Sequence, residues 1–136
     1  MKTNTYLFFN GNCEAAFKFY ADVLGGKIEA MLPHAGTPAE EHVPPEWRDK
    51  IMHAKLTLGD SVLMASDAPP PSGEEMKGFS VSLHVDAPAE AERVFHALAD
   101  GGSVTMPIAE TFWAARFGML TDRFGTPWMV NCDKPA

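Results

Sequence analysis

The sequence predicts an α+β fold in which two tandem βαβββ modules form a curved sheet around a cavity. Segments with the alternating hydrophobicity of strands and the 3.6-residue spacing of helices follow one another in the order strand, helix and three strands. This order occurs twice, and a proline-rich linker at 68–78 separates the two copies. We therefore expect a single domain over 1–136, with internal modules at 1–67 and 79–136.

The first module is expected to begin with a short strand and an amphipathic helix. The helix is predicted over 13–24, because apolar residues recur at helical spacing and Gly25-Gly26 can end it with a left-handed cap. Residues 33–50 hold four prolines together with His34 and His42, so we expect a long loop that is either solvated surface or a lid over the cavity. The strands are expected at 5–9, 28–32, 52–58 and 61–66.

The second module starts with the clearest strand pattern in the chain. Over 79–85, apolar residues alternate with Ser80, Ser82 and His84, which predicts a strand with one packed face and one polar face. The helix is expected over 89–100, and the other strands at 103–108, 117–121 and 128–132.

The two modules can be aligned residue by residue. A shift of about 76 positions pairs Phe9 with Val85 and Phe19 with Phe95, and a shift of about 66 pairs Gly59 with Gly125 in the closing hairpins. Each module alone would expose one face of its sheet, so the two are expected to sit together and enclose the cavity.

Composition excludes several classes of function. The net charge of −7 argues against nucleic acid, which requires clustered Lys and Arg. No apolar run is long enough to span a membrane and no signal peptide is evident, so we expect a cytoplasmic protein. The two cysteines, Cys13 and Cys132, have neither the number nor the spacing of a disulfide framework or a zinc site, and we expect reduced thiols.

Three strings of residues carry a family resemblance: YLFFNGNCEAAFKFY at 6–20, GFSVSLHVD at 78–86 and ETFWA..FG..TD.FG.PWM.N at 110–131. With them the chain resembles the vicinal oxygen chelate superfamily of glyoxalases, extradiol dioxygenases and bleomycin-resistance proteins, and within it the PhnB-like branch. The resemblance implies a homodimer in which modules from two chains complete each cavity. That branch has sometimes carried a demethylubiquinone methyltransferase label, but no Gly-rich loop between a strand and a helix offers a site for an adenosyl cofactor.

The resemblance also implies where a metal ion would be held, on the first and last strand of each module. These positions fall on Thr5 (or Asn4), Leu63, Ser80 and Met129. Divalent ions of the hard or borderline kind need carboxylate or imidazole ligands, so we expect no metal at the family's usual place and no other cofactor.

Three residues are candidates for catalysis, each with a structural alternative. His53 lies at a strand start, where it is either a histidine satisfied by backbone or a catalytic base. His84 should face the cavity with Ser80 and Ser82, where its imidazole would permit acid–base work. Glu110 lies beside aromatic residues that could desolvate its carboxylate and raise its pKa, or it makes a structural hydrogen bond to backbone.

The expected ligand-binding residues also include Trp113, Arg116, Phe117, Trp128 and Met129. The aromatic side chains either line a pocket for a flat or apolar ligand or belong to the core. Arg116 either pairs with Glu110 or Asp122, or meets an anionic ligand.

These observations leave three hypotheses for function. The favoured one is a metal-free protein that binds a small molecule in the cavity between its modules. The second is an enzyme that uses a metal relocated to His53, His84 and Glu110, or acid–base chemistry alone. The third is a dimeric scaffold protein.

Overall fold

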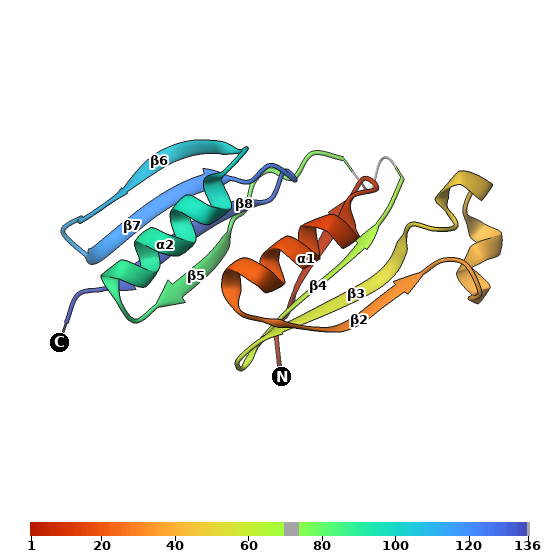
Figure 1. The fold of residues 1–136 in the computed structure, drawn as a ribbon, viewed down its shortest axis with the longest axis horizontal. Coiled ribbons are helices and arrows are strands. Elements are labelled where there is room, and N and C mark those ends of the chain that lie inside the picture. The colour runs from red at the N-terminus through yellow and green to blue at the C-terminus, as the bar shows by residue number, and fades with distance from the viewer. Residues whose placement is uncertain (70–73, 136) are drawn as a thin grey trace. The chain divides into compact units, whose positions relative to one another are not determined.

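The computed structural model describes residues 1–69 and 74–135, so part of the predicted linker, 70–73, lies outside the described residues. The chain divides into two compact units, Met1–Glu74 and Glu75–Ala136, and each runs strand, helix and three strands (Figure 1). The α+β class and the tandem βαβββ order are therefore as predicted. No helix in the described part of the chain is both long and apolar enough to cross a membrane.

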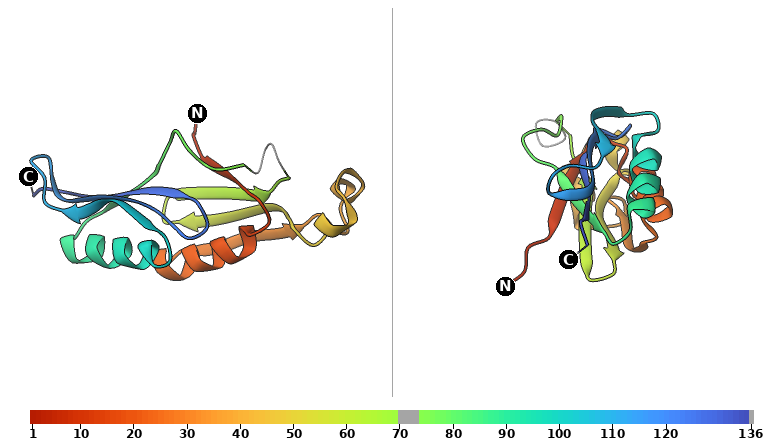
Figure 2. Two further views of the ribbon diagram at one scale, coloured as in Figure 1. Left: turned by 90° about the horizontal axis from the view of Figure 1, so that it is seen from above. Right: turned by 90° about the vertical axis from the view of Figure 1, so that its left-hand side faces the viewer.

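Unit 1 is a four-stranded sheet with one helix on it. Its elements are β1 (Thr5–Phe9), α1 (Cys13–Leu24), β2 (Lys27–Pro33), β3 (Ile51–Leu58) and β4 (Ser61–Asp67). The strand order is β1-β4-β3-β2, with β1 parallel to β4 and the other pairs antiparallel. Helix α1 lies along one face of this sheet (Figure 2) and buries Phe17 and Tyr20 there. Gly25 ends the helix in the left-handed conformation, as predicted.

Asp67, at the end of β4, joins three parts of unit 1. Its buried carboxylate accepts hydrogen bonds from the backbone N–H groups of Gly11, Cys13 and Ile51, at 2.9 to 3.0 Å. The bond to Cys13 satisfies one of the N–H groups that the first turn of a helix leaves without an intrahelical partner. One side chain thus positions the start of α1 and the start of β3.

The segment between β2 and β3 is folded and not an open loop. It contains two short 3-10 helices, η1 (Pro38–His42) and η2 (Pro45–Trp47), and Thr37 caps the first through Oγ1. His34 is buried, and both its backbone N–H and its ring Nδ1 contact the carbonyl oxygen of Lys50. The solvated-surface expectation is therefore wrong for His34, because hydrogen bonds close the base of the segment, but it holds for His42, which is exposed.

Unit 2 repeats the architecture with β5 (Val81–Val85), α2 (Pro88–Ala99), β6 (Ser103–Ala109), β7 (Ala114–Thr121) and β8 (Pro127–Asp133). The strand order is β5-β8-β7-β6, and β5 runs parallel to β8. Helix α2 packs on the sheet through Val94, Phe95 and Leu98. Gly118 makes the close approach possible, because a Cβ at that position would lie 2.6 Å from the Phe95 ring.

The register of the two units corrects the predicted alignment of the repeat. Thr5 pairs with Leu63 and Val81 pairs with Trp128, so the last strands correspond at a shift of 65 and not 66. The predicted alignment of Gly59 with Gly125 gives a shift that is one residue too large. The reason is that the turn before β8 is longer than the turn before β4. The buried faces of the helices correspond at 75 and not 76, pairing Ala16 with Ala91, Tyr20 with Phe95 and Val23 with Leu98.

Candidate functional site

Each sheet has a face covered by its helix and an opposite face, which we call the open face. In unit 2 the helix-covered face carries the buried side chains of Trp128, Val130 and Cys132, which alternate along β8 with Met129 and Asn131. Because register partners share a face, the open face also carries Ser82, His84, Phe117 and Met119. The predicted orientation of Ser82 and His84, away from the helix, agrees with this register.

The register also redefines the positions at which the resemblance places metal ligands. Leu63 is 3% exposed and belongs to the helix-covered face of unit 1, so its open-face neighbour Met64, the partner of Tyr6, takes its place. Ser80 precedes β5, and Ser82 is the residue that pairs with Met129.

The resulting set of open-face residues is Tyr6 and Met64 in unit 1, and Ser82 and Met129 in unit 2. A phenol, a hydroxyl and two thioethers do not fit a hard or borderline divalent cation, which prefers carboxylate or imidazole ligands. Elsewhere within residues 1–69 and 74–135, no three His, Cys, Asp or Glu side chains gather in a way that could hold a metal ion. The relocated site predicted from His53, His84 and Glu110 would need residues of both units, and it stays a prediction.

A chain of hydrogen bonds crosses from β5 to the end of β8. The amide nitrogen of Asn131 lies 2.8 Å from Oδ1 of Asp133 and 3.3 Å from Nδ1 of His84. Since the Asp133 carboxylate only accepts, the atom facing it is the amide Nδ2, and its second hydrogen is directed at His84. A neutral His84 therefore accepts at Nδ1 and carries its proton on Nε2, where it can donate to a ligand.

A pocket of about 350 Å³ lies next to this chain, at the end of the sheet where β5 and β8 finish. Its apolar walls are Val85, Pro88, Ala115 and Pro135, and its polar groups are His84, Asp86, Asp133 and Lys134. The pocket therefore combines hydrogen-bond donors and acceptors with an apolar wall, so it can contact both the polar and the apolar part of a small molecule.

Unit 1 fills the corresponding place with core side chains. By the register of the first strands, Phe9 corresponds to Val85, and by the buried faces of the helices Phe17 corresponds to Glu92. Phe9 and Phe17 are both buried and pack edge to face, with ring centroids 6.3 Å apart. Unit 1 thus has a buried phenylalanine ring at the position where unit 2 has Val85, which lines the pocket.

Three predicted site residues have other roles. Glu110 is 68% exposed and pairs with Lys134 at 3.6 Å, so neighbouring aromatic rings do not desolvate it as expected. Arg116 pairs with Glu92 of α2, and not with Glu110 or Asp122. Trp128 is fully buried and belongs to the core instead of a ligand surface.

Two predicted residues form an aromatic group at the connection between β6 and β7. The ring centroids of Trp113 and Phe117 lie 5.4 Å apart. Phe112, which is 88% exposed, packs edge to face on Trp113 with the ring centroids 4.8 Å apart. Phe117 is the register partner of Asn131, which places this group beside the polar chain on the open face of unit 2.

His53 lies on the open face of unit 1. Its Nδ1 is 3.2 Å from the hydroxyl of Tyr6, and the two rings stack at 5.8 Å. The histidine thus has a side-chain partner in its own unit, where the prediction expected either a backbone partner or a catalytic role.

Sequence reasoning missed Asn131, Asp133, Lys134 and Ala115. The signal that could have identified Asn131 was the alternation along β8, which places it on the same face as Met129. The other three became part of a site only through the parallel pairing of β5 with β8 and a bulge in β7.

The fold is that of a protein of paired βαβββ modules, with a pocket at the end of the sheet of unit 2. Residues 2–130 match the Glyoxalase/Bleomycin resistance protein/Dioxygenase superfamily, and the chain belongs to this family.

Three relatives cover nearly the whole chain. Protein YjdN from Escherichia coli strain K12 is 34% identical over 98% of this chain and 97% of its own length. The crystal structure of protein PA1353 from Pseudomonas aeruginosa is 56% identical, with a TM-score of 0.90 and 99% of each chain covered. A Bacillus cereus PhnB protein, named a putative 3-demethylubiquinone-9 3-methyltransferase, is 25% identical, with a TM-score of 0.81 over 97% of this chain and 99% of that one. The resemblance to the PhnB-like branch is thereby confirmed.

Proposed function

We propose that this protein binds a small organic molecule in the pocket of unit 2, without a divalent metal ion or other cofactor. The observation that carries the proposal is the difference between the two units at one place of the repeat. Unit 1 has the buried ring of Phe9, packed on Phe17, where unit 2 has the smaller Val85 and a pocket beside it.

The polar groups indicate what kind of molecule would be recognised. His84 offers an N–H at Nε2 and Lys134 an ammonium group, while Asp86 and Asp133 offer acceptors. A molecule with an apolar body and a hydroxyl or similar group, which both donates and accepts, would satisfy this arrangement. The methyltransferase name of the Bacillus cereus protein is not extended to this chain, since the turn between β5 and α2 holds only Asp86 and Ala87 and is no Gly-rich loop.

Variants that copy unit 1 into unit 2 test the proposal. Val85→Phe should fill the pocket while the unit still folds, because unit 1 carries phenylalanine at the corresponding position. Ala115→Ile, which enlarges a side chain of a second wall, should also fill it. We expect phenols from a panel of small aromatic and amphipathic compounds to raise the melting temperature of the wild type and to shift its Val85 and Ala115 amide signals. Both effects should be lost in the filled variants.

The matched control is Val104→Phe, which adds the same ring at an exposed valine of β6 outside the pocket. This variant should bind like the wild type. A panel in which no compound stabilises the wild type or shifts its pocket amides would refute the proposal.

A second candidate is proton transfer at the same pocket, favoured by the orientation of His84. The Asn131 amide occupies Nδ1, so Nε2–H of a neutral His84 would donate a hydrogen bond to the carbonyl oxygen of a bound molecule, while the carboxylate of Asp86 or Asp133 in the same pocket takes the proton from the neighbouring carbon. If the protein is such an enzyme, it should catalyse deuterium exchange into an enolisable compound that binds, and His84→Ala, which removes the donor, should slow the exchange at least tenfold while leaving binding within about tenfold. Binding without exchange would leave the binding function alone.

We also propose that the protein forms a homodimer. Aromatic side chains with substantial exposure, Phe8 in unit 1 and Phe112 and Trp113 in unit 2, support an interface, since burying them would remove apolar surface from water. Light scattering after size exclusion at micromolar concentration should give twice 14.8 kDa. A mass near that of one chain would exclude the dimer and the scaffold function that depends on it.

A further inference from the structure

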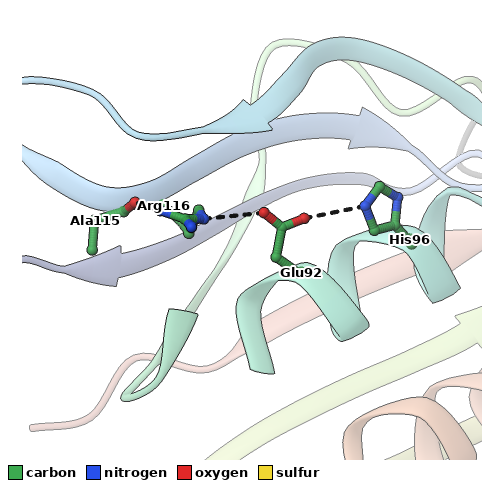
Figure 3. A network of polar contacts seen from close by, with 4 residues as sticks. All are labelled: Glu92, His96, Ala115 and Arg116. Carbon is green, nitrogen blue, oxygen red and sulfur yellow. Dashed lines mark hydrogen bonds and ion pairs between the residues drawn. The ribbon is translucent and has the colours of Figure 1, made fainter. Parts of the chain in front are cut away.

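An ion pair links α2 to β7 (Figure 3), next to the pocket residue Ala115. Nε of Arg116 donates to Oε1 of Glu92 at 3.0 Å, and the two side chains are 35% and 39% exposed. The other oxygen of Glu92 lies 3.2 Å from Nε2 of His96, one turn further along the helix. Both oxygens of the Glu92 carboxylate thus have a partner, which restricts its orientation.

The same guanidinium group also holds a wall of the pocket. Nη1 of Arg116 donates to the carbonyl oxygen of Ala115 at 2.6 Å, and Ala115 lines the pocket. The register of β7 against β8 shifts between Ala114 and Arg116, so Ala115 sits in a β-bulge, whose backbone lacks the regular ladder. The Arg116 side chain therefore gives the carbonyl oxygen of Ala115 a hydrogen bond from outside the pairing of the strands.

The opposite wall is held through the helix. Pro88 lines the pocket in the first turn of α2, and Glu92 follows it by four residues on the same side of the helix. The pair between Glu92 and Arg116 therefore connects the wall at Pro88 with the wall at Ala115.

Unit 1 has an apolar side chain at the helix position that corresponds to Glu92. By the buried faces of the helices, this residue is Phe17. Phe17 is fully buried against Phe9. An apolar contact closes unit 1, whereas unit 2 has a partly exposed ion pair at the same place. A pair with this exposure contributes little to stability, which leaves its geometry as the more important property.

We infer that Glu92 and Arg116 are positioning residues that set the width of the pocket and so determine the size of the molecule it accepts. This inference rests on the proposed function. A hydrophobic site can distinguish two ligands that differ by one or two chemical groups only when its walls cannot move. A wall that moves makes room for the larger ligand. Breaking the pair should therefore change selectivity more than it changes stability.

The test compares two probes, phenol and 2-naphthol, whose dissociation constants are measured from the Val85 amide shift. In Arg116→Met and Glu92→Gln, the ratio of the two constants should move in favour of 2-naphthol by about tenfold. Arg116→Lys keeps the positive charge but lacks the branched guanidinium group that reaches both Glu92 and Ala115. We therefore expect an intermediate change in the ratio of the two dissociation constants.

Glu90→Gln is the matched control. Glu90 forms an ion pair with Arg93 at 2.6 Å on the same helix, but this pair is exposed and neither residue lines the pocket. The ratio should stay at the wild-type value in this variant. Melting temperatures of all variants check folding, and Glu92→Gln and Arg116→Lys carry the test if Arg116→Met does not fold.

The two ways of failing are distinct. If the wild type binds the probes and both Arg116→Met and Glu92→Gln keep the ratio within twofold, the positioning role is wrong and the binding function stands. If the wild-type pocket amides shift with neither probe nor any compound of the panel, the binding function fails and the inference fails with it.

Discussion

Trp128 donates its indole N–H to Oδ2 of Asp122 at 2.8 Å, and both side chains are buried in the core of unit 2. The other carboxylate oxygen accepts the backbone N–H groups of Phe124 and Thr126, at 2.9 and 3.0 Å. One carboxylate thus shapes the turn before β8 and positions the largest core side chain. This explains the TD.FG.PW string, whose role is structural.

Removing this carboxylate should destabilise the protein strongly. Asp122→Ala leaves three donors without their acceptor, and we expect a loss of roughly 3 kcal/mol or more in the free energy of unfolding. Urea denaturation followed by tryptophan fluorescence measures the loss. Asp60→Ala, at the exposed turn between β3 and β4, is the control and should stay within about 0.5 kcal/mol of the wild type. An equal effect of the two substitutions would contradict the role given to Asp122.

The thiol of Cys13 should reduce stability at alkaline pH. Burial first, then the nearby carboxylates of Asp67 and Glu14, raise the pKa of this thiol well above its ordinary value of 9.0. The folded protein therefore keeps a proton that the unfolded chain loses above about pH 9, so the free energy of unfolding should fall as pH rises from there.

For one proton the slope is about 1.4 kcal/mol per pH unit, and Cys13→Ala should remove it. Urea denaturation between pH 8 and 10.5 measures both slopes. Parallel curves for the wild type and the variant would show that the thiol does not titrate differently on folding. The same burial should leave Cys13 unreactive towards thiol reagents until the protein unfolds.

The hydrogen-bond chain through Asn131 should control the tautomer of His84. In the wild type, nitrogen NMR shifts should show neutral His84 protonated at Nε2, because the amide of Asn131 donates to Nδ1. Asn131→Asp replaces this donor with an acceptor, so the proton should move to Nδ1. The control is His53, whose tautomer should not change, since it lies in the other unit beside Tyr6. The same tautomer in both proteins would show that Asn131 does not orient His84.

Metal binding should be absent from the positions that the family resemblance indicates and should be gained by substitution. Ser82 and Met129 are register partners on one face, so Ser82→His with Met129→Glu places an imidazole beside a carboxylate. Zinc at tenfold above its dissociation constant should stabilise this double variant by about 1.4 kcal/mol. The wild type should show no such change. Zinc, nickel, manganese or iron in stoichiometric amount in wild-type protein purified without chelator would contradict the expectation.

Most of the fold could be predicted from local signals. The bounds of α1 follow from apolar spacing and a terminal glycine, and those of β1 from a short apolar run between polar residues. These signals act over a few residues, so they are visible in the sequence. The predicted alignment of the closing hairpins was wrong by one residue because Gly59 and Gly125 lie in turns of different length. The length of such a turn depends on the side chain that organises it, which in unit 2 is Asp122.

The site could be predicted only in part. His84 was expected on the open face, which alternation along a strand determines. Its connection to Asp133, 49 positions away, depends on the pairing of β5 with β8, and no local pattern contains this information.

The sequence by itself determined the class of fold, the repeat and the family, because local hydrophobic periodicity, turn residues and a distinctive closing string carry them. Only the tertiary structure decided that Trp128 is core, that Arg116 pairs with Glu92, and that unit 2 has a pocket at Val85 where unit 1 has the buried ring of Phe9. The physical reason is that a side chain's neighbours across a sheet, or between a helix and a sheet, are set by register and packing. These bring together residues that are far apart along the chain.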